Sequence, residues 1–192
     1  LFVNVAMFAV EIFGGAQSGS ASLLADAVDF FGDAANYALS LAVLSMGMLW
    51  RSRAALVKGL CKGGFGIFVL GHTAWRFAAG TTPEAFTMGG IALLALAANL
   101  GVALLLYAYR SGDANMRSVW LCTRNDAIGN AAVMLAALGV FGTGSGWPDW
   151  AVAILMGALA LSASVSVVRA ARSELAAAAP SVVVRHRVGH KH

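Results

Sequence analysis

Four side chains on two hydrophobic segments could together bind a metal ion. Asp29 and Asp33 lie four positions apart in the second hydrophobic segment of the chain. Cys122 and Asp126 have the same spacing in the fifth. Because side chains four apart are neighbours on a helix, each pair offers two ligands on one helix face. Three carboxylates and one thiol would complete a tetrahedral site between the two segments.

A carboxylate inside a hydrophobic segment requires a reason, because placing one in hydrocarbon costs at least roughly 2.5–3.5 kcal/mol. Asp26 lies on the same helix face as Asp29 and Asp33, and we expect it beside the route to the site rather than among the ligands. Asn36 continues this stripe, and Asn125 belongs to the facing stripe of the fifth segment. A hydrogen-bonded network that only ties helices together is the alternative, but the opposed pairs favour a metal site.

The composition of the chain indicates a membrane protein. Of its 192 residues, 59% are hydrophobic and only 11% are charged, whereas soluble domains carry about 25% charged residues. Six segments are apolar enough to be helices in a bilayer. They are about Leu1–Gly15, Ser20–Leu49, Ala54–Phe77, Phe86–Tyr109, Val119–Phe141 and Trp150–Val168. The predicted fold is therefore all-α, with six transmembrane helices in the cell (inner) membrane.

Basic residues predict the orientation of the six segments, since Lys and Arg collect on the cytoplasmic side. The connections expected inside carry Arg51, Arg53, Lys58, Arg110, Arg117, Arg169 and Arg172. The opposite side has Arg76 alone. Both termini are thus predicted to be cytoplasmic, and the net charge of +4 reflects topology rather than nucleic-acid binding.

Two regions are expected from this layout. Residues 1–172 form the transmembrane domain, and residues 173–192 form a short basic tail, disordered and cytoplasmic, with His186, His190 and His192. The tail either collects metal or is simply held near anionic lipid, and its composition favours the second.

The depth of the carboxylates favours transport. At the rise of a helix, Asp33 lies about 20 Å from Ser20 and Asp126 about 15 Å from Met116. Both positions are close to the middle of a core about 30 Å thick. Alternating-access transporters place their substrate at this depth, between helices. Zn²⁺ or Cd²⁺ suits the partly soft ligand set best, ahead of Fe²⁺, Co²⁺ or Mn²⁺, and the ligands would exchange metal for protons.

The second and fifth segments resemble those of the cation diffusion facilitators. Residues 18–33 read SGSASLLADAVDFFGD and are similar to a family motif in which Asp29 and Asp33 are the metal-binding positions. Residues 122–126, CTRND, resemble the HxxxD of the family's fifth span. The resemblance implies a homodimeric exporter that moves Zn²⁺, Cd²⁺, Fe²⁺, Mn²⁺ or Co²⁺ out of the cytosol in exchange for protons, without a resident cofactor.

Two departures from the family pattern affect these expectations. Cys122 replaces the usual His or Asp, which favours softer ions. The family's soluble C-terminal metal-binding domain is not expected after the sixth span, so a dimer would rely on the membrane helices. The third segment, with Gly63, Gly64 and Gly66, is the candidate contact, although these small residues could equally serve packing within the bundle.

Two other functions remain as alternatives to a transporter. An intramembrane aspartyl protease also places Asp residues on two helices, but it would use a GxGD-type motif, and Asp126 follows Arg124 and Asn125. A membrane scaffold without transport would tolerate Cys122 as a lost ligand. Glu11 and Arg124 are further charges within the spans, and they either pair or Arg124 extends toward the cytoplasm.

Overall fold

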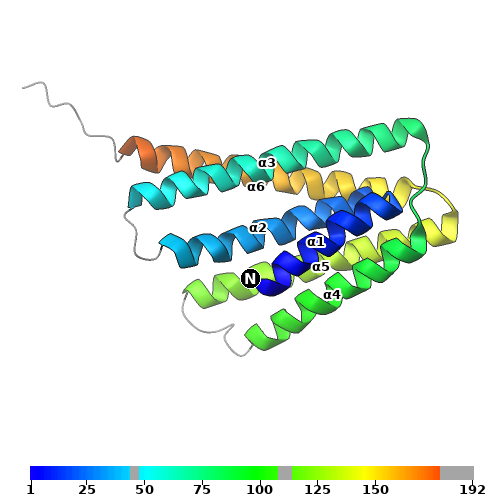
Figure 1. Ribbon diagram of the computed structural model, residues 1–192, viewed down its shortest axis with the longest axis horizontal. Coiled ribbons are helices and arrows are strands. Elements are labelled where there is room, and N and C mark those ends of the chain that lie inside the picture. The colour runs from blue at the N-terminus through cyan, green and yellow to red at the C-terminus, as the bar shows by residue number, and fades with distance from the viewer. Residues whose placement is uncertain (44–47, 108–113, 178–192) are drawn as a thin grey trace, which may run out of the picture.

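The computed structural model describes residues 1–43, 48–107 and 114–177, which form six α-helices. These are α1 Phe2–Ser18, α2 Ala21–Val43, α3 Met48–Ala79, α4 Ala85–Tyr107, α5 Ala114–Thr143 and α6 Trp147–Ala177. The helices run side by side along the length of the molecule (Figure 1), and the described ranges contain no strand. The prediction of an all-α protein is confirmed.

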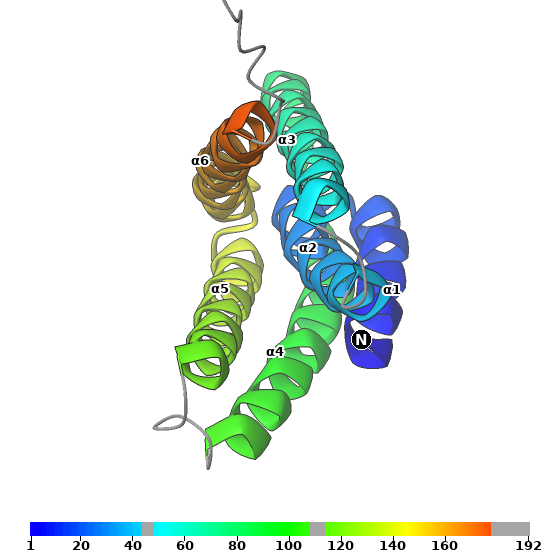
Figure 2. The same ribbon diagram turned by 90° about the vertical axis from the view of Figure 1, so that its left-hand side faces the viewer.

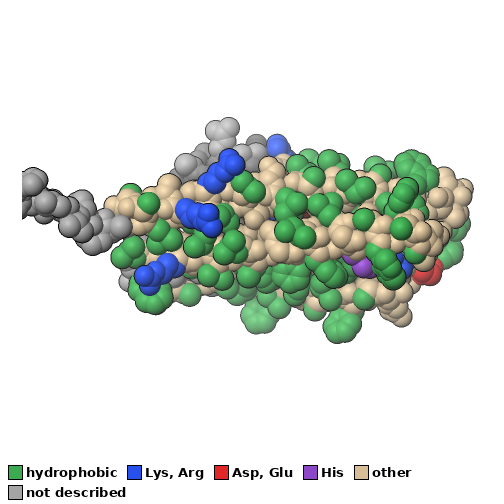
Figure 3. All heavy atoms as spheres, turned by 90° about the horizontal axis from the view of Figure 1, so that it is seen from above, with side chains coloured by type: hydrophobic (Ala, Val, Ile, Leu, Met, Phe, Trp, Pro, Cys, Tyr) green, Lys and Arg blue, Asp and Glu red, His purple; other side chains and the backbone are tan. Residues whose placement is uncertain are grey.

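The helices have the length and surface of a multi-pass membrane protein. Helices α3, α4, α5 and α6 are each long and apolar enough to cross a bilayer, whereas α1 is apolar but has only 17 residues. Large apolar side chains point outward, among them Phe2, Phe13, Phe86 and Leu105. Such side chains would be costly in water but match the acyl chains of lipid. Hydrophobic side chains accordingly cover much of the surface in Figure 3.

Helix boundaries differ most from the predicted segments at two places. Helix α3 already contains Leu49, which the sequence analysis assigned to the second segment. The chain from Leu41 to Trp50 is almost continuously apolar, so hydropathy alone could not divide it. Helix α6 continues through Ala177, into the residues assigned to the tail, and residues 178–192, including its histidines, lie outside the described ranges.

Helix α2 lies at the centre of the bundle. It packs against α1, α3, α5 and α6, while α3 lies along α6 and α4 along α5. The end-on view in Figure 2 shows α2 between α1 and α3. A helix with so many neighbours can place polar side chains against several of them, which explains how α2 accommodates three carboxylates.

The apolar core is concentrated toward one end of the bundle. Its fully buried members include Leu23 of α2, Val69 of α3, Met88 of α4 and Val133 of α5. These positions lie near the α1–α2, α3–α4 and α5–α6 connections. On the face shown in Figure 3, most Lys and Arg side chains lie toward the opposite end, where α6 finishes. The bundle therefore has a closely packed end and a basic end.

Asp149 at the start of α6 caps the start of α2. Its Oδ1 accepts hydrogen bonds from Ser20 Oγ at 2.6 Å, Ser22 Oγ at 2.6 Å and the Ser22 amide at 3.0 Å, and its Oδ2 accepts one from the Ala21 amide at 2.8 Å. The first amides of a helix lack partners within the helix. A fully buried carboxylate here satisfies them and fixes the two helix ends together.

Gly19 allows the turn into this cap. Its φ of 69° lies in the left-handed region, which glycine adopts without a steric penalty. At the neighbouring α3–α4 connection, Glu84 accepts hydrogen bonds from the amides of Phe86 and Thr87 and so caps α4. These hydrogen bonds, with those from Thr87 contributing most and that from Phe86 less, hold the pKa of the exposed Glu84 below its usual range.

Candidate functional site

Three carboxylates of α2 and α5 form one electrostatic cluster. Asp33 of α2 and Asp126 of α5 interact directly with each other, and Asp29 interacts with both. All three side chains are half-buried, beyond the packed apolar core. Carboxylates at close range in a low-dielectric setting repel one another unless protons or a cation lie between them. The cluster is therefore a place where a cation is stabilised.

A lysine of α3 already provides one positive charge to this cluster. Lys62 Nζ donates a hydrogen bond to Asp29 Oδ1 at 2.9 Å, with the two side chains 21% and 33% exposed. The ammonium also interacts electrostatically with Asp33 and Asp126. Lys62 was not among the predicted site residues, although a lysine within an apolar segment is a detectable signal in the sequence. Its pairing could not be read from the sequence, because α2 and α3 had no known register.

The arrangement is not a closed metal site. In the described part of the chain, no three His, Cys, Asp or Glu side chains converge closely enough to hold an ion. The side chain of Cys122 lies outside what the structure describes, although its backbone belongs to α5. The proposed fourth ligand therefore stays a prediction, and the three carboxylates would have to draw together around a metal.

The residues expected to support the site have different surroundings. Asp26 is buried, 2% exposed, whereas Asn36 and Asn125 are exposed. Asn125 Oδ1 accepts a hydrogen bond from Arg124 Nη2 at 3.1 Å.

The suggested pair between Glu11 and Arg124 is wrong. Glu11 is fully buried on α1 and Arg124 is exposed. Neither Glu11 carboxyl oxygen has a well-formed hydrogen bond within the described residues. Asp26 is the charged side chain that interacts most strongly with Glu11. The acidic cluster therefore extends from α5 through α2 to α1, because Asp29 also interacts with both Glu11 and Asp26.

A small pocket leads to Asp33. Its volume is about 90 Å³, and its wall includes Asn4 of α1, Tyr37 of α2 and Asn99 of α4 beside Asp33 itself. These residues lie in the half of the bundle away from the packed core. Amide and hydroxyl groups therefore share this pocket with the carboxylate, beside the apolar Leu1, Val3 and Val102.

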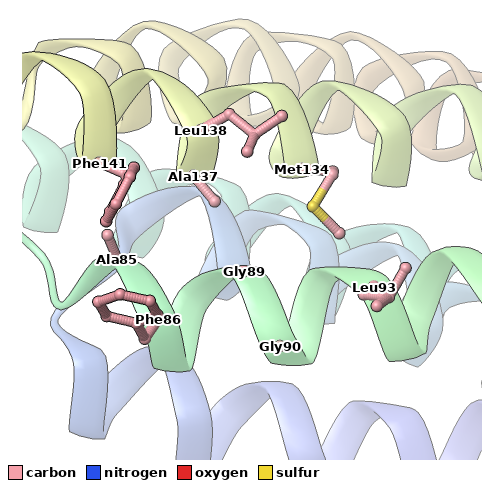
Figure 4. Close-up of a pocket in the computed structure, with 9 residues that line it drawn as sticks. All are labelled: Ala85, Phe86, Gly89, Gly90, Leu93, Met134, Ala137, Leu138 and Phe141. Carbon is pink, nitrogen blue, oxygen red and sulfur yellow. The ribbon is translucent and has the colours of Figure 1, made fainter.

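A larger pocket between α4 and α5 has no such chemistry. It has a volume of about 330 Å³ and is lined by apolar side chains and glycines, including Phe86, Met134 and Phe141 (Figure 4). Hard or borderline cations need oxygen, nitrogen or thiolate ligands, and none of its lining side chains supplies one. This pocket therefore offers a cation fewer possible ligands than the acidic cluster does.

Comparison with known proteins identifies the family. The family model for the cation efflux transmembrane domain matches residues 1–176, nearly the whole described chain. The chain belongs to the cation efflux family. This assignment confirms the resemblance to cation diffusion facilitators and the expected multi-pass membrane domain.

Two curated relatives agree with this assignment. The cation efflux domain is 26% identical over 159 residues to the metal cation efflux system protein CzcD of Cupriavidus metallidurans, covering 77% of this chain and 50% of the relative. The cation efflux system protein CzcD of an Alcaligenes strain matches equally, at 26% over 159 residues. The chain thus spans about half the length of the curated relatives it matches.

Proposed function

We propose that this protein exports Zn²⁺ or Cd²⁺ from the cytosol in exchange for protons, and that Asp29, Asp33, Cys122 and Asp126 bind the ion. The single observation that carries the proposal is the direct interaction between Asp33 of α2 and Asp126 of α5 inside a membrane bundle. Two facing carboxylates from different helices form a cation site whose size changes when the helices move. Fe²⁺, Co²⁺ and Mn²⁺ would bind less well to a site that includes a thiolate.

Proton exchange follows from the ligands themselves. Metal binding requires deprotonated carboxylates and thiolate, so a proton and a metal ion compete for the same atoms. When the metal leaves on the far side, protons must neutralise the facing carboxylates before the helices return. The family assignment supports the cation, and the facing carboxylates support the exchange.

The packing suggests the direction from which the metal arrives. The apolar core seals the end near the α1–α2, α3–α4 and α5–α6 connections. The pocket at Asp33 lies in the other half, toward the end that the basic residues assign to the cytoplasm. We therefore assign this arrangement to a state that accepts metal from the cytosol.

A homodimer through α3 is part of the proposal. A Cβ added to Gly63 would lie 2.5 Å from Ser164 Oγ and one added to Gly66 would lie 3.3 Å from Leu161 Cγ, so these glycines already pack against α6. Gly64 and Gly71 have nothing within 4 Å of an added Cβ. Seven residues apart, they share one outward face of α3 on which a second copy could approach closely.

Transport into proteoliposomes tests the proposed exchange. Zinc uptake should accelerate when the vesicle lumen is made acidic, because protons leaving the lumen drive metal inward. Asp33→Ala and Asp126→Ala should each remove this uptake, whereas Asn36→Ala, on the same helix as Asp33 but exposed, should retain it. Zinc uptake that ignores the imposed pH gradient would contradict proton exchange.

A further inference from the structure

Lys62 of α3 forms an ion pair with Asp29, one of the predicted metal ligands. Its Nζ lies 2.9 Å from Asp29 Oδ1, within hydrogen-bonding distance. It also interacts with Asp33 and Asp126, so its charge is shared by the whole carboxylate cluster. At this position the ammonium supplies part of the positive charge that a bound divalent cation would supply.

The surface of α2 is shaped to admit this side chain. A Cβ added at Gly32 would lie 3.4 Å from Lys62 Nζ, 3.7 Å from Cδ and 3.9 Å from Cε. The end of the lysine therefore runs across the bare backbone of Gly32 to reach Asp29. A larger side chain at this position would occupy the path of the lysine, which makes the contact a specific feature of the α2–α3 interface.

We propose that Lys62 is a tethered cation that occupies the carboxylate cluster when metal is absent and must leave Asp29 for metal to bind. The proposal rests on the proposed function, because it assumes that Asp29 and Asp126 bind the ion. Lys62 stays charged throughout and acts by competition, in the way that a second bound cation would. It neutralises Asp29 in the empty carrier and lowers the affinity of the cluster for metal, which favours release.

Electrostatics determines the direction of the effect. A divalent ion and an ammonium cannot both lie against Asp29 without repulsion between them, and this repulsion is strong in a partly buried site. Lys58, one turn away on α3, interacts with Asp33 as well.

The test compares Zn²⁺ binding to the full-length purified protein by isothermal titration calorimetry. Lys62→Met removes the charge and keeps a side chain of similar shape, and we expect it to tighten Zn²⁺ binding by about tenfold. Lys62→Arg keeps the charge and should bind Zn²⁺ no more tightly than the parent protein. Equal affinities for parent, Lys62→Met and Lys62→Arg would overturn the proposal.

Adding Asp126→Ala separates this inference from the proposed function. If Lys62→Met leaves affinity unchanged while Asp126→Ala removes binding, the tethered cation is wrong and the carboxylate site stands. If the Lys62→Met/Asp126→Ala double variant binds Zn²⁺ as tightly as Lys62→Met, the site itself is wrong, and the inference fails with it.

A measurement on the unmodified chain covers the case in which Lys62→Met does not fold. Amine-reactive labelling followed by peptide mass spectrometry reports how accessible the Lys62 ammonium is. Saturating Zn²⁺ should raise the labelling of Lys62 severalfold over that in the metal-free protein, because the ion displaces it from Asp29. Labelling of Lys62 that stays constant or falls on adding Zn²⁺ would refute displacement.

Discussion

Lys62 Nζ of α3 lies 2.9 Å from Asp29 Oδ1 of α2, so one carboxylate of the acidic cluster is neutralised from within the chain. Asp33 and Asp126 interact more strongly with each other than with any other charged side chain. The three carboxylates are thus not equivalent. Asp29 is paired with the flexible side chain of Lys62, whereas Asp33 and Asp126 are brought together by the packing of α2 against α5.

The ion pair predicts coupling between Asp29 and Lys62 in stability. Asp29→Ala leaves a half-buried ammonium without its partner, and Lys62→Met leaves a carboxylate beside two others. The double variant avoids both conditions, so it should be more stable than the sum of the single effects by about 1 kcal/mol. Thermal unfolding of the four proteins in detergent measures this coupling. Strictly additive effects would show that the pair contributes nothing.

The Asp149 cap predicts a structural phenotype away from the site. Asp149→Ala leaves two buried hydroxyls and the first amides of α2 without an acceptor, which should cost about 3 kcal/mol. Asp149→Asn keeps one carbonyl oxygen and should cost less. The readout is the thermal midpoint of unfolding, with metal binding at low temperature as the control. An Asp149→Ala variant as stable as the parent would mean that the hydrogen bonds from Ser20 and Ser22 do not hold α2.

The α3–α6 interface predicts different outcomes for two adjacent glycines. Gly63→Ala places a methyl group 2.5 Å from Ser164 Oγ, which itself donates a hydrogen bond to Gly59 O at 2.7 Å. The resulting strain should cost about 1–3 kcal/mol. Gly64→Ala meets nothing within 4 Å and should not destabilise the monomer. The comparison uses thermal unfolding of the monomeric protein, and equal losses for the two variants would contradict this packing.

A larger substitution at Gly64 addresses the proposed dimer. If second copies meet on the Gly64 face of α3, Gly64→Leu should lower the dimer fraction measured by light scattering in detergent, because the larger side chain keeps the backbones apart. The matched change Gly90→Leu, at an exposed glycine of α4 with nothing within 4 Å of an added Cβ, should leave the dimer fraction unchanged. A dimer fraction that Gly64→Leu does not alter would place the contact elsewhere.

The proposed thiolate predicts an ion-dependent effect at Cys122. Cys122→Ser replaces a soft ligand with a hard one, so binding of Cd²⁺ should weaken by about tenfold and binding of Mn²⁺ should change little. Competition titrations of the purified protein measure both affinities. Cys61→Ser, at an exposed free cysteine of α3, is the matched control. Equal losses for Cd²⁺ and Mn²⁺ would remove the argument for a soft site.

Sequence periodicity predicted the parts of this protein that depend on one helix at a time. The apolar segments located six helices, and the four-residue spacing placed Asp29 and Asp33 on one side of α2. The exception was the apolar stretch around Leu49, where hydropathy contains no signal for a break.

Contacts between helices could not be predicted in the same way. The Lys62–Asp29 pair depends on the register of α3 against α2. The acceptor for Ser20 and Ser22 is Asp149, which is more than a hundred residues away along the chain. The isolation of Glu11 from Arg124 likewise reflects which faces of α1 and α5 turn inward. Such register is set by packing of the whole bundle.

The most direct test of the central claim is the zinc stoichiometry of the purified protein after equilibrium dialysis. The account predicts one Zn²⁺ per chain for the parent, for Asn36→Ala and for a variant in which His186, His190 and His192 are all alanine. It predicts loss of that ion in Asp33→Ala and in Asp126→Ala, with each variant still folded in the membrane. Full zinc occupancy in both aspartate variants would show that α2 and α5 do not hold the ion.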